Sequence, residues 1–98
     1  MNQAVRNIGE IDRVVHEPAR LMIVALLFAV KQADFLYLQH ETALNKGTLS
    51  SHLARLEEAG YVSIEKVFQG KTPRTLLQLT AAGRAAFQKY RRDLKRVL

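Results

Sequence analysis

Residues 46–59 (KGTLSSHLARLEEA) carry side chains of the kind that hydrogen-bond to nucleic-acid bases and phosphates. Leucines at positions 49, 53 and 56 recur at helical spacing, so the segment is predicted to be an amphipathic helix with one buried stripe. Small residues let a backbone approach base edges, hydroxyls donate or accept hydrogen bonds there, and arginine reaches guanine or phosphate. We therefore expect the outer face to contact DNA through Lys46, Gly47, Thr48, Ser50, Ser51 and Arg55. A solvated amphipathic helix would show the same pattern, and the neighbouring segments decide between the two interpretations.

The segment after this helix predicts a basic hairpin. Two strand-like runs, residues 61–68 and 74–79, flank a five-residue loop at 69–73 (QGKTP). A cationic tip beside a base-reading helix can reach a phosphate or the minor groove, so we expect Lys71, Thr72 and Arg74 to contact DNA. Lysine near a strand edge also prevents edge pairing, and this explanation suits Lys66 better than the loop residues.

The charge of the chain is unevenly distributed. Residues 1–45 hold four basic and five acidic side chains, a net charge of −1, whereas residues 46–98 hold eleven basic and four acidic, a net charge of +7. The positive field therefore belongs to the half that contains the helix and the hairpin, where it would attract a polyanion.

Catalytic and metal-binding patterns are missing from the sequence. With no cysteine, the chain cannot form disulfides, thiolate zinc sites or iron–sulfur clusters. The histidines at 16, 40 and 52 are far apart, no Ser–His–Asp set or glycine-rich phosphate loop is visible, and His52 is expected to pack under the hairpin. We predict a protein that is not an enzyme and needs no metal or other cofactor.

The length and the order of the elements indicate one α+β domain, mostly helical, over residues 1–98. The apolar run 21–30 is half the length of a membrane span and is interpreted as a central core helix, in a cytoplasmic protein without membrane contact. Helices are predicted at about 4–15, 17–32, 39–44, 46–59 and 81–97, with residues 35–38 either a short strand or the entry to a helix. Asn45 and Thr80 are predicted helix caps. Two short helices around a turn, followed by a hairpin, predict a winged helix-turn-helix. Its wing sheet, at about 61–79, would have two or three strands, flanked by N- and C-terminal helices.

Four stretches carry a resemblance to a known family: residues 16–21 (HEPARL), 46–62 (KGTLSSHLARLEEAGYV), 70–75 (GKTPRT) and 79–84 (LTAAGR). Through them the chain resembles the MarR/ArsR-like group of winged-helix transcriptional regulators, closest to a small single-domain subfamily. The resemblance implies sequence-specific binding of double-stranded DNA by a homodimer, with a recognition helix at 46–59 and a wing at 66–75. The cysteine motif of the metal-sensing members is missing, which excludes sensing through thiolates.

One interpretation of the last helix is that it packs on its own core. The resemblance instead favours a dimer formed through the first and last helices, at about 4–15 and 81–97. The residues predicted at its interface are Val5, Ile8, Ala86, Tyr90 and Leu94. A two-fold dimer would read a near-palindromic site, with half-sites about 10–10.5 base pairs apart. The alternative is a winged helix that serves as a protein- or RNA-interaction module in a larger assembly, which an apolar outer face on residues 46–59 would favour.

Overall fold

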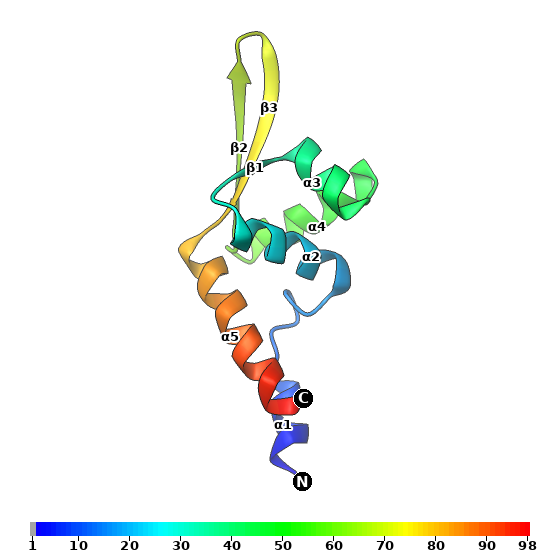
Figure 1. The fold of residues 1–98 in the computed structure, drawn as a ribbon, viewed down its shortest axis with the longest axis vertical. Coiled ribbons are helices and arrows are strands. Elements are labelled where there is room, and N and C mark those ends of the chain that lie inside the picture. The colour runs from blue at the N-terminus through cyan, green and yellow to red at the C-terminus, as the bar shows by residue number, and fades with distance from the viewer. Residues whose placement is uncertain (1) are drawn as a thin grey trace.

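The computed structural model describes residues 2–98, which form five helices and a three-stranded antiparallel sheet. The elements are α1 (Gln3–Gly9), α2 (Pro18–Ala29), β1 (Ala33–Asp34), α3 (Phe35–Thr42), α4 (Lys46–Glu58), β2 (Val62–Gln69), β3 (Thr72–Leu79) and α5 (Ala81–Val97). The molecule is 59 Å long, with the β2–β3 hairpin at one end, α1 and the end of α5 at the other, and α2, α3 and α4 between them (Figure 1). The predicted α+β, mostly helical winged helix is confirmed.

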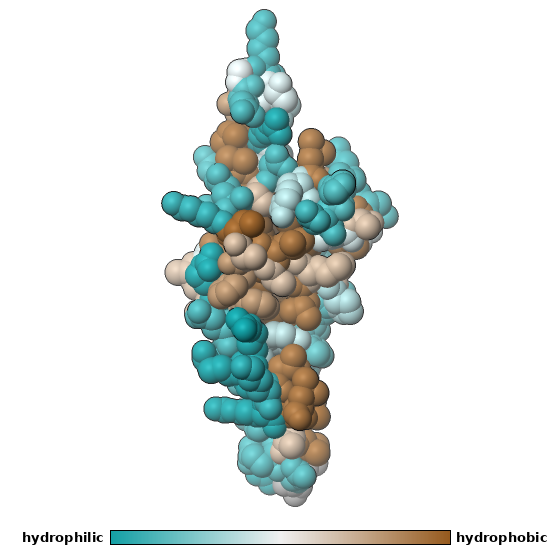
Figure 2. Space-filling model, viewed as in Figure 1, coloured by the Kyte–Doolittle hydropathy of each residue, from teal (hydrophilic) through white to brown (hydrophobic). Residues whose placement is uncertain are grey.

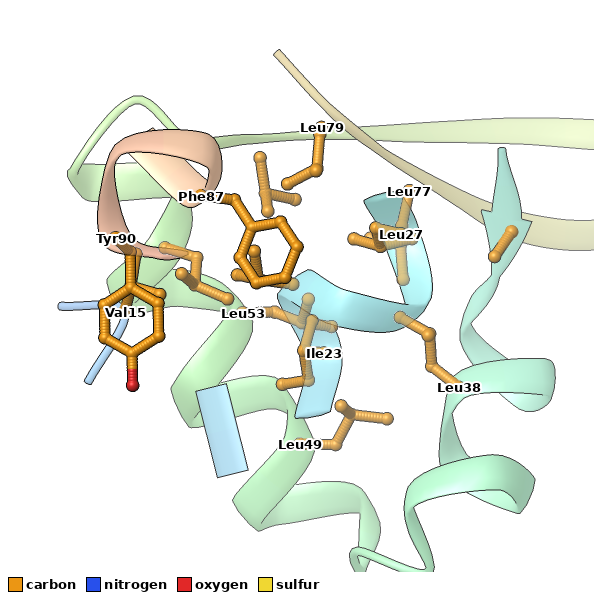
Figure 3. Close-up of a cluster of buried hydrophobic side chains, with 14 of the residues drawn as sticks. Val15, Ile23, Leu27, Leu38, Leu49, Leu53, Leu77, Leu79, Phe87 and Tyr90 are labelled. Atoms are coloured by element: carbon orange, nitrogen blue, oxygen red, sulfur yellow. The ribbon is translucent and has the colours of Figure 1, made fainter. Parts of the chain in front are cut away.

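The core lies between α2, α4, the base of the sheet and α5 (Figure 3). Ile23 and Leu27 of α2 and Leu77 of β3 are completely buried, and each such side chain contributes roughly 1.5–3 kcal/mol to folding. The apolar run 21–30 is therefore central, as predicted. Only one side of it is covered, however, because Met22 is 41% exposed.

The first helix is shorter than predicted. Helix α1 ends at Gly9 instead of near residue 15, and the chain then turns around Asp12. The Asp12 carboxylate accepts hydrogen bonds from the backbone N–H groups of Val14, at 2.8 Å, and Val15, at 3.2 Å. Aspartate side chains that bind nearby N–H groups compete with the helical hydrogen bonds, and here the turn directs Val15 into the core.

The boundaries before the helix-turn-helix also differ from those predicted. Helix α2 ends at Ala29 instead of residue 32, because Val30 is extended and the chain enters β1. In β1, Ala33 pairs with Leu77 and Asp34 with Leu76, which adds a third strand to the hairpin. Residues 35–38 are helical, as part of α3, and the Asp34 side chain caps this helix by accepting from the N–H of Tyr37.

The base of the hairpin is fixed to α5 at one close contact. The Thr80 hydroxyl donates to the Gly60 carbonyl at 2.6 Å, and it also caps α5 by accepting from the N–H of Gly83. Gly83 packs directly on the Tyr61 backbone, where a Cβ atom would lie 2.8 Å from the Tyr61 carbonyl carbon. Only glycine fits at this position. The GYV and LTAAGR stretches of the sequence therefore meet in space.

Candidate nucleic-acid interface

Helix α4 presents a polar outer face, and its orientation is fixed by its buried side. Leu49, Leu53 and Leu56 are buried, and the predicted cap Asn45 accepts from the N–H of Thr48 at 2.8 Å. The predicted contact residues of α4 are exposed except for Thr48, which is half-buried: Lys46, Gly47, Thr48, Ser50, Ser51 and Arg55. The structure therefore brings these six residues together on and beside one accessible face of α4.

Arg55 lies towards the C-terminal half of this face. Its guanidinium is 3.8 Å from the Glu58 carboxylate, and both side chains are more than half exposed. An exposed pair of this kind contributes about 0–1 kcal/mol, so the arginine can leave its partner for a base or a phosphate at little cost.

The turn between α3 and α4 sets the angle between the two helices. Helix α3 ends at Thr42, and Ala43 follows in the left-handed region with φ 59°. Leu38 of α3 and Leu49 of α4 are both completely buried, so the core holds the helices on either side of this turn. Two helices joined by such a short turn form the helix-turn-helix unit that the sequence predicted.

The hairpin has a tighter turn than predicted. Gln69 pairs with Thr72, so Gly70 and Lys71 form a two-residue turn in place of the expected five-residue loop. Gly70 has φ 66°, the left-handed geometry that a two-residue hairpin turn with glycine first requires. Lys71 and Thr72 are exposed at this tip, as their predicted role needs.

Arg74 is not at the tip, where the sequence placed it. It pairs with Val67, two pairs further along the ladder than Gln69 and Thr72. Its Nη1 donates to Asp34 Oδ2 at 2.9 Å, and its Nε is buried without a hydrogen-bond partner among the described residues. The difference follows from β1, which lies at residues 33–34, just before the short strand that the sequence allowed at 35–38, and which places Asp34 beside β3. Arg74 is therefore a residue that ties the wing to the start of α3.

A groove of about 670 Å³ separates α4 from the hairpin and is closed at its base by α3. Leu36, Leu53, Ile64 and Pro73 supply apolar wall, and the groove opens beside the cations of α4 and the wing. Its cationic lining residues are Lys46, Lys66 and Arg74, and its acidic ones are Asp34 and Glu57. The surface around the projecting hairpin is mostly hydrophilic, with isolated apolar groups (Figure 2).

The histidines do not form a metal site. His52 Nδ1 lies 3.2 Å from Arg20 Nη1 and 3.6 Å from Glu17 Oε2, so it connects α4 to the start of α2. The expectation that His52 packs under the hairpin was wrong, because its helix position faces α2. Desolvation opposes ionisation of Glu17, but hydrogen bonds from the backbone of Arg20 and Ala19 outweigh it and lower the Glu17 pKa. Between residues 2 and 98, no three His, Cys, Asp or Glu side chains are grouped so that they could hold a metal ion.

The residues predicted at a dimer interface divide into two groups. Val5 and Ile8 of α1 are 49% and 57% exposed, and Ala86 and Leu94 of α5 are half-buried. Tyr90 is 3% exposed and its hydroxyl is 2.8 Å from His16 Nδ1. Tyr90 thus belongs to the core of its own chain and has almost no surface left to offer a partner, which corrects its predicted role.

Membrane insertion through a helix has no candidate in the part of the chain that the structure describes. Each helix of residues 2–98 is too short or too polar to span a bilayer.

The comparisons with known proteins agree with this geometry. The winged helix DNA-binding domain family matches residues 19–98, from α2 to the last residue. The chain belongs to the winged helix DNA-binding domain family. An uncharacterized protein from Methanocaldococcus jannaschii is 35% identical to this winged-helix chain over 79 residues, which cover 80% of the chain and 85% of the relative. DNA is the class of partner that the family indicates.

Solved structures extend the likeness to nearly the whole chain. A transcriptional regulator homologue from Pyrococcus horikoshii OT3 superposes with a TM-score of 0.88 at 29% identity, over 98% of this chain and 94% of its own. NadR, solved in complex with 4-hydroxyphenylacetate, has a TM-score of 0.73 at 24% identity over 95% of this chain and 63% of NadR, which shows the shared fold. The resemblance to winged-helix transcriptional regulators is therefore confirmed.

Sequence reasoning missed the part that Asp34 plays in positioning this winged-helix surface, and it identified Thr80 only as the cap of α5. Asp34 caps α3 and holds Arg74, and Thr80 joins the end of the wing to Gly60. For Asp34 the available signal was an aspartate directly before an apolar run, which is typical of a helix cap. Its second role depends on a strand pairing that the local sequence does not encode.

Proposed function

We propose that this protein is a homodimeric transcriptional regulator that binds duplex DNA sequence-specifically and acts by binding alone, without catalysis. The observation that supports the proposal most directly is that the exposed face of α4 and the basic hairpin flank one groove. A helix in the major groove beside a wing on the adjoining backbone would use both surfaces at once.

In this proposal the outer face of α4 enters the major groove. Gly47 and Ser51 are exposed and small, so the α4 backbone can come close to base edges. Arg55 reads a base, and Lys71 and Thr72 at the hairpin tip contact the sugar–phosphate backbone. The second half of the sequence has a net charge of +7, which attracts the polyanionic DNA and speeds its association with the protein.

The homodimer is proposed to form through α1 and α5. A seven-residue helix such as α1 (Gln3–Gly9) is marginal alone, and α1 has no buried residue although it lies against α5. Val5 and Ile8 leave apolar surface exposed there, and Leu98 at the end of the chain is 93% exposed. A second copy related by a two-fold axis would bury these groups and place two α4 helices on one face of a duplex.

Selection of bound fragments from genomic DNA, followed by footprinting, tests the regulator proposal. We expect a near-palindrome with half-site centres about 10–10.5 base pairs apart, protected equally after dialysis against a chelator. A protein that retains its fold but selects no common sequence at any salt concentration would contradict sequence-specific binding. Loss of protection after chelation would contradict the proposal that neither metal nor other cofactor is needed. The proposal places the protein in the cytoplasm, with the chromosome.

The roles of α4 and the wing are separable by two variants. Arg55→Ala should relax the preferred sequence, because a lost base contact removes about 1–3 kcal/mol of discrimination. Lys71→Ala should weaken the binding of all DNA sequences alike, and it should lower the slope of log affinity against log salt concentration by about one. Arg92→Ala, an exposed cation on the part of α5 far from the hairpin, is the matched control and should change neither (Figure 1). Identical sequence preferences for Arg55→Ala and the unmodified protein would refute the assignment.

Light scattering tests the homodimer. The unmodified protein should have twice the mass of one chain, and Val5→Asp with Ile8→Asp should give monomers because two charges would be buried in an apolar contact. Arg6→Asp, on another side of α1 and also exposed, is the control that should remain dimeric. A monomeric unmodified protein at tens of micromolar would refute the assembly without affecting the fold.

A further inference from the structure

Phe68 of β2 is the most exposed large apolar side chain within the described sheet and helices. It is 76% exposed, while Val62 and Ile64 on the same strand are buried or half-buried. The ladder explains the difference: Ile64 pairs with Leu77 over the core, whereas Phe68 pairs with Pro73 where the hairpin projects beyond the helices (Figure 1). Folding of one chain therefore gains little from an aromatic residue at this position.

The face of the hairpin that carries Phe68 is turned towards the groove beside α4. Side chains alternate along a strand, so Phe68 lies on the same side as Ile64 and Lys66. Both of these residues line the groove, and so do Pro73 and Thr75, the cross-strand partners of Phe68 and Lys66. Phe68 continues this surface one step closer to the tip.

The charges around Phe68 select the kind of partner. Residues 66–74 (KVFQGKTPR) contain three cations and no acidic residue. Arg74 is paired with Asp34, so Lys66 and Lys71 supply the positive charge near Phe68. Lys66 and Lys71 are exposed on either side of Phe68 along the chain, at intervals that place positive charge around one aromatic ring. A polyanion that also offers apolar contacts fits this arrangement, and the minor groove of a duplex, whose sugar walls lie between two rows of phosphates, has that chemistry.

We propose that Phe68 enters the minor groove next to the α4 site and makes an apolar contact with sugars and base edges there. The inference rests on the proposed function and adds to it a positioning residue that is not a cation. Lys71 and Lys66 then bind the flanking phosphates, while Phe68 fixes how deeply the wing is seated. Apolar side chains inserted in this way widen or kink the groove, so DNA deformability beside the half-site becomes part of the specificity.

A tryptophan reporter tests the contact directly, because the chain contains no tryptophan. Phe68→Trp should show quenched, shifted fluorescence when the selected duplex is added, as the indole becomes desolvated against the bases. Glu65→Trp is the matched control, since residue 65 is exposed on the opposite face of the same strand. Its fluorescence should stay nearly constant through the same titration.

Affinity and its salt dependence provide a second, independent readout. Phe68→Ala should weaken binding of the selected duplex by about tenfold, the scale of one lost buried aromatic contact, with an unchanged salt slope because no phosphate contact is lost. Lys71→Ala should instead reduce the slope by about one. Circular dichroism should give the same spectrum for Phe68→Ala and the unmodified protein, since the side chain is mostly exposed.

The outcomes separate this inference from the proposed function. If the unmodified protein binds no duplex, the proposed function fails first. If it binds DNA but Phe68→Trp is not quenched and Phe68→Ala binds as tightly as the unmodified protein, the inference alone is overturned. A change of mass in light scattering on Phe68→Ala would also overturn it, because Phe68 would then contact another copy of the chain.

Discussion

Replacement of Gly83 by alanine tests the contact that joins the wing to the C-terminal helix. A Cβ atom at this position would lie 2.8 Å from the carbonyl carbon of Tyr61 and 3.0 Å from its Cα. Both neighbours are backbone atoms of the residue directly before β2, so they cannot rotate away as a side chain would. Helix α5 must therefore shift away from the strand.

The size of the effect follows from three contributions. Overpacking of this kind costs about 1–3 kcal/mol, and the upper part of that range applies because the obstruction is backbone. The shift also weakens the hydrogen bonds of Thr80 to Gly60 and Tyr61, each contributing about 1 kcal/mol. Alanine recovers up to about 1 kcal/mol of helix propensity. We expect Gly83→Ala to lower the free energy of unfolding by about 2–4 kcal/mol.

Urea and thermal unfolding at one fixed protein concentration measure this loss, since a dimer's stability depends on concentration. For a chain of this length, the expected change in the free energy of unfolding corresponds to a fall in Tm of roughly 10–20 °C. Gly9→Ala is the matched control: Gly9 also lies in a helix, nothing is within 4 Å of its added Cβ, and the change should stay within about 0.5 kcal/mol. If Gly83→Ala and Gly9→Ala had the same free energy of unfolding, the inference that α5 packs closely on the Tyr61 backbone would be refuted.

Three further predictions concern the α4 surface, the Tyr61 hydroxyl and the wing. Gly47→Ala should preserve or slightly raise stability, because its Cβ would meet only the Asn45 side chain at 3.7 Å, yet weaken DNA binding in gel-shift titrations by holding α4 away from the bases. The hydrogen bond from Tyr61 to Asp12 raises the Tyr61 pKa to about 12, above its ordinary value of 10. This stabilisation is complete below pH 10 and is lost as pH rises towards 12, so Tyr61→Phe should show a weaker decline in unfolding free energy over that interval. Arg74→Ala should weaken DNA binding, but the slope of log affinity against log salt concentration should not fall by one, because the guanidinium is already paired with Asp34. A fall of one would identify Arg74 as a phosphate contact.

The α4 surface was predictable because everything that creates it is local. Three leucines at helical spacing define the buried side, and the outer side follows from the same periodicity. The caps at Asn45 and Thr80 were likewise readable from residue type, and both accept the hydrogen bonds expected of them. Local patterns fix which way a helix faces once one of its sides is apolar.

The parts that sequence reasoning missed depend on partners distant in the chain. Arg74 looked like a free cation at a loop, but Asp34, forty residues earlier, neutralises it through the pairing of β1 with β3. Tyr90 was predicted at the dimer interface, but it is buried in the core of its own chain, with its hydroxyl 2.8 Å from His16 Nδ1. The over-long first helix had a different, local cause, since hydrogen bonds from the N–H groups of Val14 and Val15 to the Asp12 side chain outweighed helical periodicity.

The wing is held at two places and is free beyond them, and this division matters for how it could read DNA. Asp34 fixes β3 to the start of α3 through Arg74, and Gly60 fixes the base of β2 to α5 through Thr80. Among the described residues, the hairpin beyond Arg74 has no support except its own ladder, which places Phe68 and Lys71 on an unsupported end. Helix α4, packed by its leucines, has no comparable freedom. A rigid base-reading helix and a less constrained wing would let one protein demand a fixed major-groove sequence while adapting to the width of the minor groove next to it.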